Sequence, residues 1–188
     1  MLRKLDENLW VIDHEFAMPG GIQIGTRTTV IRLSDGSLFV HALGPADDWD
    51  HVEISKLGHV AHAVAPNLFH NEFVEDWASR YEGAKFYAPE TFEEKVPSLD
   101  FEVLTDLCFN MVHSDSFITR LVMRIMGGYG HFGPSRLAKS FMKDKAAIRR
   151  GIDKILEWDF DRVTVTHGVV LERGGHEKFK QGYAWLKG

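Results

Sequence analysis

The sequence predicts a mixed α/β fold in a single domain over residues 1–188. The main indication is a strand–helix–strand order in the middle of the chain, with buried strands predicted at residues 59–65 and 84–88. A β-hairpin pattern precedes this unit. The composition, 44% hydrophobic and 26% charged, is ordinary for a globular domain. A chain of this length buries enough surface to fold without disulfides.

The first third of the chain is predicted to form strands. Residues 9–12 are a short apolar run. Residues 28–33 and 37–41 are rich in β-branched and apolar side chains and flank the turn signal at 34–36, which predicts a hairpin. Pro19-Gly20-Gly21 predicts a loop before it.

The middle of the chain is predicted to form a strand–helix–strand unit. A short helix over residues 52–55 comes first, and the strand at 59–65 ends at Pro66. A helix is predicted from Asn67, because apolar residues recur at three- and four-residue spacing, at Phe69, Phe73, Val74 and Trp77. Acidic residues in its first turns favour the same interpretation. The helix ends at Gly83, before the next strand.

The remaining elements are predicted less regularly. Strands are expected at residues 101–105 and 160–166, and a glycine-rich loop at 127–134. Helices are expected at residues 116–126 and 175–186, and a third begins after the N-cap residue Ser135. A fourth helix carries an apolar stripe from Ala147 to Leu156. The basic residues of this fourth helix are expected to lie on its solvent-exposed face.

Three predicted strand ends carry side chains that bind metals. The first is the segment 66–72 with His70, the second is Thr105-Asp106, and the third is Thr166-His167-Gly168. In open α/β sheets, sites form beyond the carboxyl ends of strands. Imidazole and carboxylate are the usual ligands of zinc and iron. His70, Asp106 and His167 are therefore the candidate metal ligands.

The order of these strand ends resembles the metallo-β-lactamase superfamily, in which a late strand commonly ends in a His-Gly pair whose His binds metal. Residues 59–70, 104–110 and 158–162 are similar to a bacterial branch of that superfamily with a degenerate metal motif. The resemblance covers most of the chain. It implies a four-layer αββα sandwich, in which two sheets pack together and helices cover their outer faces.

The sequence departs from this superfamily at its strongest motif, His-x-His-x-Asp-His. The matching stretch has His70, with Asn67, Asn71 and Glu72 as weaker donors, and its register against the motif stays open. A two-metal centre needs more ligands than His70, Asp106 and His167 supply. The expectation is therefore at most one divalent metal (zinc, iron or manganese), with no metal as the alternative.

Plainer interpretations of the same residues stay open. His70 can be a surface or capping residue, Asp106 can cap a turn, and the His167 ring can make a structural hydrogen bond to the backbone. Other histidines are expected to be ordinary strand or loop residues, namely His41, His59, His62 and His113. His131 can line a pocket mouth, whereas Cys108 between apolar neighbours is expected to be a buried hydrophobe. The glycine-rich loop has neither the G-x-x-x-x-G-K-[ST] spacing nor the G-x-G-x-x-G spacing of phosphate-binding loops, so it is not expected to bind phosphate.

Two functions follow. The first is a metallo-β-lactamase-like hydrolase in which one metal activates water, with lactam, thioester, phosphodiester and lactone substrates all open. The alternative is an inactive pseudoenzyme of the same fold that binds a small molecule or a protein. A net charge of -5 argues against nucleic acid, and no apolar run is long enough to span a membrane, so neither is an expected partner. The lone Cys108 and the absence of a signal peptide favour a cytoplasmic location. The oligomeric state stays open.

The length favours a shortened second sheet. In the resembled fold, several strands open the second half before the Thr-Asp strand end. Here residues 92–97 are followed almost at once by residues 101–106. About 30–40 residues are absent relative to that pattern, given that a strand takes ~5–6 residues. A deletion at 97–101, or a segment absent from this sequence, is the hypothesis.

Overall fold

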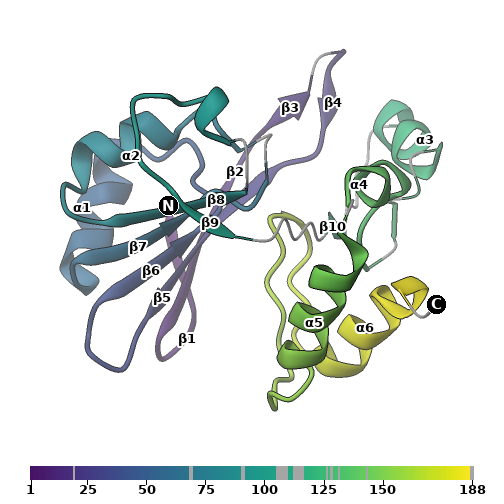
Figure 1. Ribbon diagram of the computed structural model, residues 1–188. Helices are drawn as coiled ribbons and strands as arrows, with labels where there is room; N and C mark the ends of the chain where they lie inside the picture. The colour runs from purple at the N-terminus through teal and green to yellow at the C-terminus, as the bar shows by residue number, and fades with distance from the viewer. Residues whose placement is uncertain are drawn as a thin grey trace. The chain divides into compact units, whose positions relative to one another are not determined.

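In the computed structural model, the described residues are 1–18, 20–67, 70–89, 92–104, 110–111, 117–125, 127, 129–130, 132–142 and 144–186 (Figure 1). The chain divides into two units. The first unit comprises Met1–His14 and Thr26–Asp106, and the second comprises Glu15–Gly25 and Leu107–Gly188. The single domain over residues 1–188 stays a prediction.

A seven-stranded mixed sheet forms the centre of the first unit, in the order β1-β2-β5-β6-β7-β8-β9 (Figure 1). Its strands are β1 (Leu2–Asp6), β2 (Leu9–His14), β5 (Thr26–Arg32), β6 (Leu38–His41), β7 (Val60–Val64), β8 (Lys85–Pro89) and β9 (Glu102–Leu104). The pairs from β1 to β6 are antiparallel, and those from β6 to β9 are parallel. The parallel half therefore presents four carboxyl strand ends along one edge.

The predicted hairpin is confirmed. Strands β5 and β6 pair in register, with Val30 opposite Val40. Their turn closes because the Asp35 carboxylate accepts hydrogen bonds from the Ser37 backbone N–H at 2.9 Å and from its hydroxyl at 2.6 Å. Gly36 has φ +85°, a conformation that a residue with a Cβ adopts only with strain. The turn residues thus fix the register of the two strands.

Two helices, α1 (Asp48–Leu57) and α2 (Val74–Arg80), cover one face of this sheet (Figure 1). Ile54 of α1 and Trp77 of α2 are fully buried against strand residues, including Leu38 and Val40. Burying an aliphatic side chain of this size contributes about 1.5–3 kcal/mol, so this layer supplies the main core of the unit. The strand–helix–strand order predicted from the sequence is confirmed.

Both helices differ in length from the prediction. Helix α1 begins earlier, because Asp47 caps it by accepting a hydrogen bond from the Asp50 backbone N–H at 2.7 Å. Helix α2 begins at Val74, so the predicted helical start at Asn67 is wrong. The His70 backbone N–H donates to the Asn67 carbonyl at 3.1 Å, which closes a turn before the helix.

Between β8 and β9 the chain forms a short 3-10 helix, η1 (Phe92–Glu94). The ring of Phe92 packs against that of Phe101, with 5.0 Å between the ring centroids. Strand β9 then pairs with β8, so it extends the first sheet. Within the described part of this stretch, no strand of a second sheet precedes β9. The deletion at residues 97–101 stays a hypothesis.

Among its described residues, the second unit combines four α-helices with short strand pairs. Its elements are β3 (Ala17–Met18), β4 (Ile22–Gln23), β10 (Asn110–Met111), α3 (Phe117–Ile125), α4 (Arg136–Phe141), α5 (Lys145–Ile155), β11 (His167–Gly168), α6 (Gly175–Gly182) and η2 (Ala184–Leu186). Its core packs Ile148 and Ile152 of α5 against Phe179 and Tyr183. Ser135 caps α4 as predicted, accepting a hydrogen bond from the Ala138 backbone N–H.

The strand predicted at residues 160–166 is wrong. Val163 instead makes an isolated antiparallel bridge with Leu171. The Asp161 side chain accepts a hydrogen bond from the Gly174 N–H, and its carbonyl accepts one from Gly175, so this stretch is tied into a loop before α6. Among the described residues of this unit, strands pair two by two, as β3–β4 and β10–β11. No helix in the described parts of the chain is long and apolar enough to cross a membrane.

Candidate functional site

The first candidate site lies at the edge of the sheet where the parallel strands β6 to β9 have their carboxyl ends. Strand β6 ends at His41, which is in register with Val64 at the end of β7. Val64 is in turn opposite Tyr87 of β8, and Ala88 and Pro89 of β8 pair with the end of β9. Segments that leave these strands start from one edge, where sites of α/β sheets commonly form.

His70 follows β7 at this edge. After Val64, the Ala65 backbone N–H donates to the Tyr87 carbonyl at 2.9 Å, which keeps the chain against β8 for one more residue. Asn67 is buried, and His70 is half-buried in the turn before α2. The imidazole therefore belongs to a strand–turn–helix connection and lies outside the helix itself.

Asp106 lies outside the described residues. The nearest described residue is Leu104, where β9 ends. The predicted role of Asp106 stays a prediction.

His167 lies in the second unit, where β11 pairs in parallel with β10. Its Nδ1 lies 2.6 Å from the carbonyl oxygen of Gly25. Because a carbonyl can only accept, Nδ1 carries the proton and donates it to this bond, so Nε2 is the ring nitrogen with the lone pair. Burial lowers the pKa of His167, and the bond to Gly25 partly opposes this shift. The ring is thus neutral at pH 7.

The residue after His167 explains the His-Gly pair. Gly168 has φ +106°, outside the range that side chains with a Cβ tolerate without strain. The backbone turns sharply here, directly after the imidazole. The pairing of histidine with glycine is therefore a requirement of the local chain path.

The sequence predicts an ordinary strand histidine at His41, and the structure gives this residue a more specific place. Burial lowers its pKa to about 4, so the ring is neutral at pH 7. Ala42, next in the chain, has φ +61° and is the only non-glycine residue with positive φ among those described. Its N–H donates to the Val64 carbonyl and its carbonyl accepts from the Thr28 hydroxyl, both at 2.9 Å.

Strained backbone of this kind costs about 1–3 kcal/mol and concentrates at functional sites. The signal in the sequence was the position of His41 at a predicted strand end, the same criterion that selected His70. His41 therefore joins the residues of interest at the carboxyl edge of the first unit.

Comparison with solved structures identifies the fold. The metallo-β-lactamase FIM-1 from Pseudomonas aeruginosa, in its mono-zinc form, is 13% identical with a TM-score of 0.54, covering 100% of this chain and 96% of that one. The DIM-1 metallo-β-lactamase is 12% identical with a TM-score of 0.54, covering 100% and 98%. The chain has the fold of the metallo-β-lactamase superfamily.

The metal-soaked Flv1 flavodiiron core from Synechocystis sp. is also similar to this metallo-β-lactamase-fold chain. It is 8% identical with a TM-score of 0.57, covering 99% of this chain and 60% of that one. A scan against protein-family models found no match, and neither did a search of curated proteins. The predicted fold class is confirmed by structural similarity alone.

The predicted metal ligands are distributed over both units of this metallo-β-lactamase fold. His70 is in the first unit and His167 in the second. Among the described residues, no group of three or more His, Cys, Asp or Glu side chains could hold a metal ion. His167 by itself fits a metal-binding imidazole, because such a ring usually donates its other N–H to a carbonyl or carboxylate.

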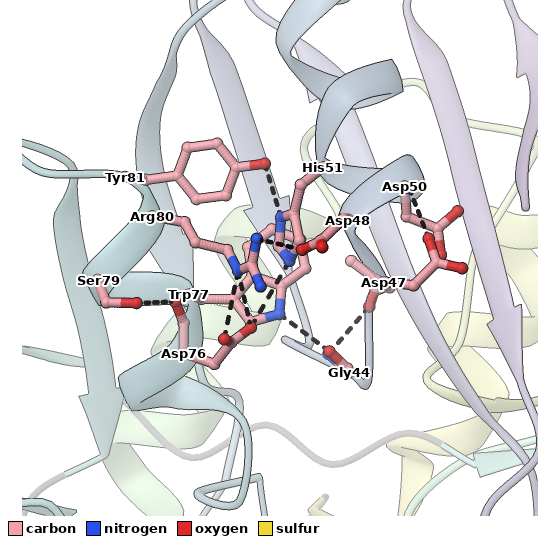
Figure 2. A network of polar contacts seen from close by, with 11 residues as sticks. Gly44, Asp47, Asp48, Asp50, His51, Asp76, Trp77, Ser79, Arg80 and Tyr81 are labelled. Atoms are coloured by element: carbon pink, nitrogen blue, oxygen red, sulfur yellow. Dashed lines mark hydrogen bonds and ion pairs between the residues drawn. The ribbon is translucent and has the colours of Figure 1, made fainter.

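A separate polar network joins α1 to α2 in the first unit (Figure 2). His51 is buried, with Nδ1 2.9 Å from the Tyr81 hydroxyl and Nε2 3.7 Å from an Asp76 carboxylate oxygen. Arg80 bridges Asp76 at 3.2 Å and Asp48 at 2.8 Å. This network was not predicted from the sequence, although the four-residue spacing of Asp76 and Arg80 is a local signal for their ion pair.

The protonation states in this network favour a structural role. Burial raises the pKa of Tyr81 to about 12, so its hydroxyl keeps its proton and can donate to His51 Nδ1. Burial and the nearby Arg80 charge lower the pKa of His51, so the ring is neutral, with its own proton on the Nε2 that faces Asp76. Both ring nitrogens thus face neighbouring side chains. An open depression of about 660 Å³ lies beside them, lined mainly by α1 residues together with Arg80 and Tyr81.

Proposed function

We propose that this chain is a metal-dependent hydrolase domain that holds at most one divalent cation, with His70, Asp106 and His167 as its ligands. The fold supports this proposal, and the observation that carries it is the His167 ring. Its Nδ1–H bond to the Gly25 carbonyl fixes a neutral tautomer with a basic Nε2, the form that binds metals.

The donor set suits zinc, iron or manganese, since these ions accept imidazole nitrogen together with carboxylate oxygen. Three protein ligands leave a coordination position for water, as in catalytic zinc sites. A bound ion would supply Lewis-acid chemistry, lowering the pKa of coordinated water toward ~7. The Gly25 carbonyl orients the His167 ring, and the Asn67 carbonyl accepts a hydrogen bond from the His70 backbone N–H. The substrate is proposed to be a small molecule with a lactam, thioester, phosphodiester or lactone bond.

Metal analysis tests the proposal. The full chain is stripped of metal, reloaded separately with zinc, iron and manganese, desalted, and analysed for bound ions. The expected result is up to one ion per chain, lost in the His167→Ala variant. His176→Ala is a matched control, because His176 also places a ring nitrogen 2.9 Å from a backbone carbonyl, that of Leu156. A metal content well below one ion per chain that is equal in the wild type, His167→Ala and His176→Ala would overturn the proposal.

A second candidate is a catalytically inactive protein of the same fold that binds a small molecule or a protein. The specific observation in its favour is the segment after β7, where His70 stands in place of the several imidazoles of the superfamily motif. In this case divalent ions would not raise the midpoint of thermal unfolding, whereas a cation bound by the native state should raise it. Metal-dependent hydrolysis of any of the four bond types, abolished by His167→Ala, would exclude this candidate.

A cytoplasmic location is part of the proposal, because the lone Cys108 suits a reducing compartment. Fractionation of cells that express the full chain tests it. Recovery outside the cytoplasm, in the periplasm or the medium, would contradict it.

A further inference from the structure

Helix α3 of the second unit exposes its apolar side. Four of its large hydrophobic residues are 50% to 70% exposed, namely Phe117, Ile118, Leu121 and Ile125. At 100° per residue these four positions fall within an arc of about 100°. An amphipathic helix ordinarily buries such an arc against its own domain, and α3 does not.

The opposite side of α3 is the one anchored to the unit. Thr119 and Met123 are buried, and the Thr119 hydroxyl accepts a hydrogen bond from the Gln23 backbone N–H of β4 at 3.2 Å. This contact fixes the rotation of the helix, which points the apolar arc away from β4. The exposed face is therefore a consequence of how the helix is docked.

The charged residues of α3 and of the segment that follows it are all basic. Between residues 116 and 143 the sequence has five basic and no acidic residues. Arg124 stacks at 5.2 Å over the Tyr129 ring, and the Arg136 side chain passes against Gly127, just after the helix. The second unit as a whole has 14 basic and 9 acidic residues, a net charge of +5, whereas the first has 8 and 18, a net charge of −10.

We propose that this α3 surface, an apolar arc bordered by Arg120 and Arg124, binds the surface of an anionic lipid bilayer. In such binding a helix lies in the plane of the interface, with its apolar arc among the acyl chains and its arginines at the headgroups. Binding at the bilayer surface needs no apolar run long enough to span the membrane, so the absence of such a run from the sequence does not exclude this partner. The proposal is independent of the metal.

Two other occupants explain the surface less well. A second copy docked through α3 would oppose like charges, and two such arcs would bury on the order of 1,000 Å², below the ~1,200–2,000 Å² of stable interfaces. A nucleic acid would engage the arginines and leave the apolar arc in water, because its phosphates contact basic and polar groups. An anionic bilayer is the partner that uses both features.

Vesicle co-sedimentation tests the proposal on the full chain. Wild-type protein is mixed at about 0.1 M salt with vesicles of phosphatidylcholine alone, or with about 30% phosphatidylserine. The expected result is binding to the anionic vesicles only, weakened by added salt. The double variant Leu121→Ser/Ile125→Ser should bind at least about tenfold more weakly. Arg120→Gln/Arg124→Gln should bind more weakly and with less dependence on salt.

Trp158→Ser is the matched control, because Trp158 is an exposed aromatic residue of the same unit outside α3. It should bind like the wild type. Wild-type protein that sediments with neither kind of vesicle, or a double variant that binds as the wild type does, would overturn the proposal. So would a wild-type dimer, measured by light scattering, that the double variant converts to a monomer, since a second copy would then cover the arc.

Discussion

Replacing His41 should remove a large part of the pH dependence of stability. Its pKa is about 4 in the folded chain, against an ordinary value of 6.5, because the ring is buried. The unfolded chain therefore binds the proton more tightly. The resulting stabilisation is fully present above pH 6.5 and is lost as the pH falls through 6.5 toward 4. Complete protonation would cost the native state on the order of 3 kcal/mol.

The magnitude between two practical pH values follows from the same numbers. Going from pH 7.5 to 5.0, the His41 contribution to the free energy of unfolding should fall by about 2 kcal/mol. Urea unfolding followed by circular dichroism at both pH values measures this loss. The His41→Gln variant, which has no imidazole to protonate, should lose about 2 kcal/mol less than the wild type.

Phe39→Leu is the control for this experiment. It disturbs the same strand two residues away while keeping His41, so its pH dependence should match the wild type. Equal losses of stability in wild type and His41→Gln would refute the reasoning. In that case the ring would be hydrated enough in the native state to titrate as it does in the unfolded chain.

Three further substitutions test the structural argument through urea unfolding at pH 7.5. Trp77→Phe removes the indole N–H that donates to the Gly44 carbonyl at 2.9 Å and should cost about 1–3 kcal/mol; a loss within error of zero would mean that water satisfies this carbonyl. Gly168→Ala forces a Cβ into a backbone at φ +106° and should cost about 1–3 kcal/mol, and unchanged stability would contradict the strained turn. Asp47→Ala removes the N-cap of α1 and should cost about 0.5–2 kcal/mol, whereas Asp47→Asn should keep most of the stability because an Asn side chain also caps; equal effects of the two variants would contradict a capping role.

The parts of the fold that local chemistry controls could be predicted from the sequence. The β5–β6 hairpin follows from Asp35 and Gly36, which close the turn between two β-rich runs. The strand–helix–strand order follows from the apolar spacing around Trp77 and from the proline and glycine residues that end its elements. Ser135 was correctly predicted to begin α4, because the N-cap hydrogen bond to Ala138 is a local interaction.

The errors arise where specific hydrogen bonds override the pattern of apolar residues. The spacing of Phe69 and Phe73 is typical of a helix, yet the hydrogen bond from His70 to Asn67 closes a turn there. The apolar alternation at residues 160–166 is typical of a strand, but Asp161 ties the stretch to Gly174 and Gly175.

The candidate site was only partly predictable for the same reason. His167 follows a predicted strand in the sequence, whereas the structure has only the two-residue strand β11 there. The contact that defines its tautomer, with Gly25, spans 142 residues of sequence. No local pattern contains such a contact. The burial that lowers the pKa of His41 is likewise a property of the folded sheet.

X-ray absorption at the zinc edge, on the full chain loaded with one equivalent of zinc, tests the central claim most directly. The proposed ligands, His70, Asp106 and His167, predict imidazole scattering and a first shell of nitrogen and oxygen at ~2.0–2.2 Å. The His167→Ala variant should lose imidazole scattering. A shell of water oxygens alone, or a sulfur scatterer at ~2.3 Å from Cys108, would contradict the proposed metal site.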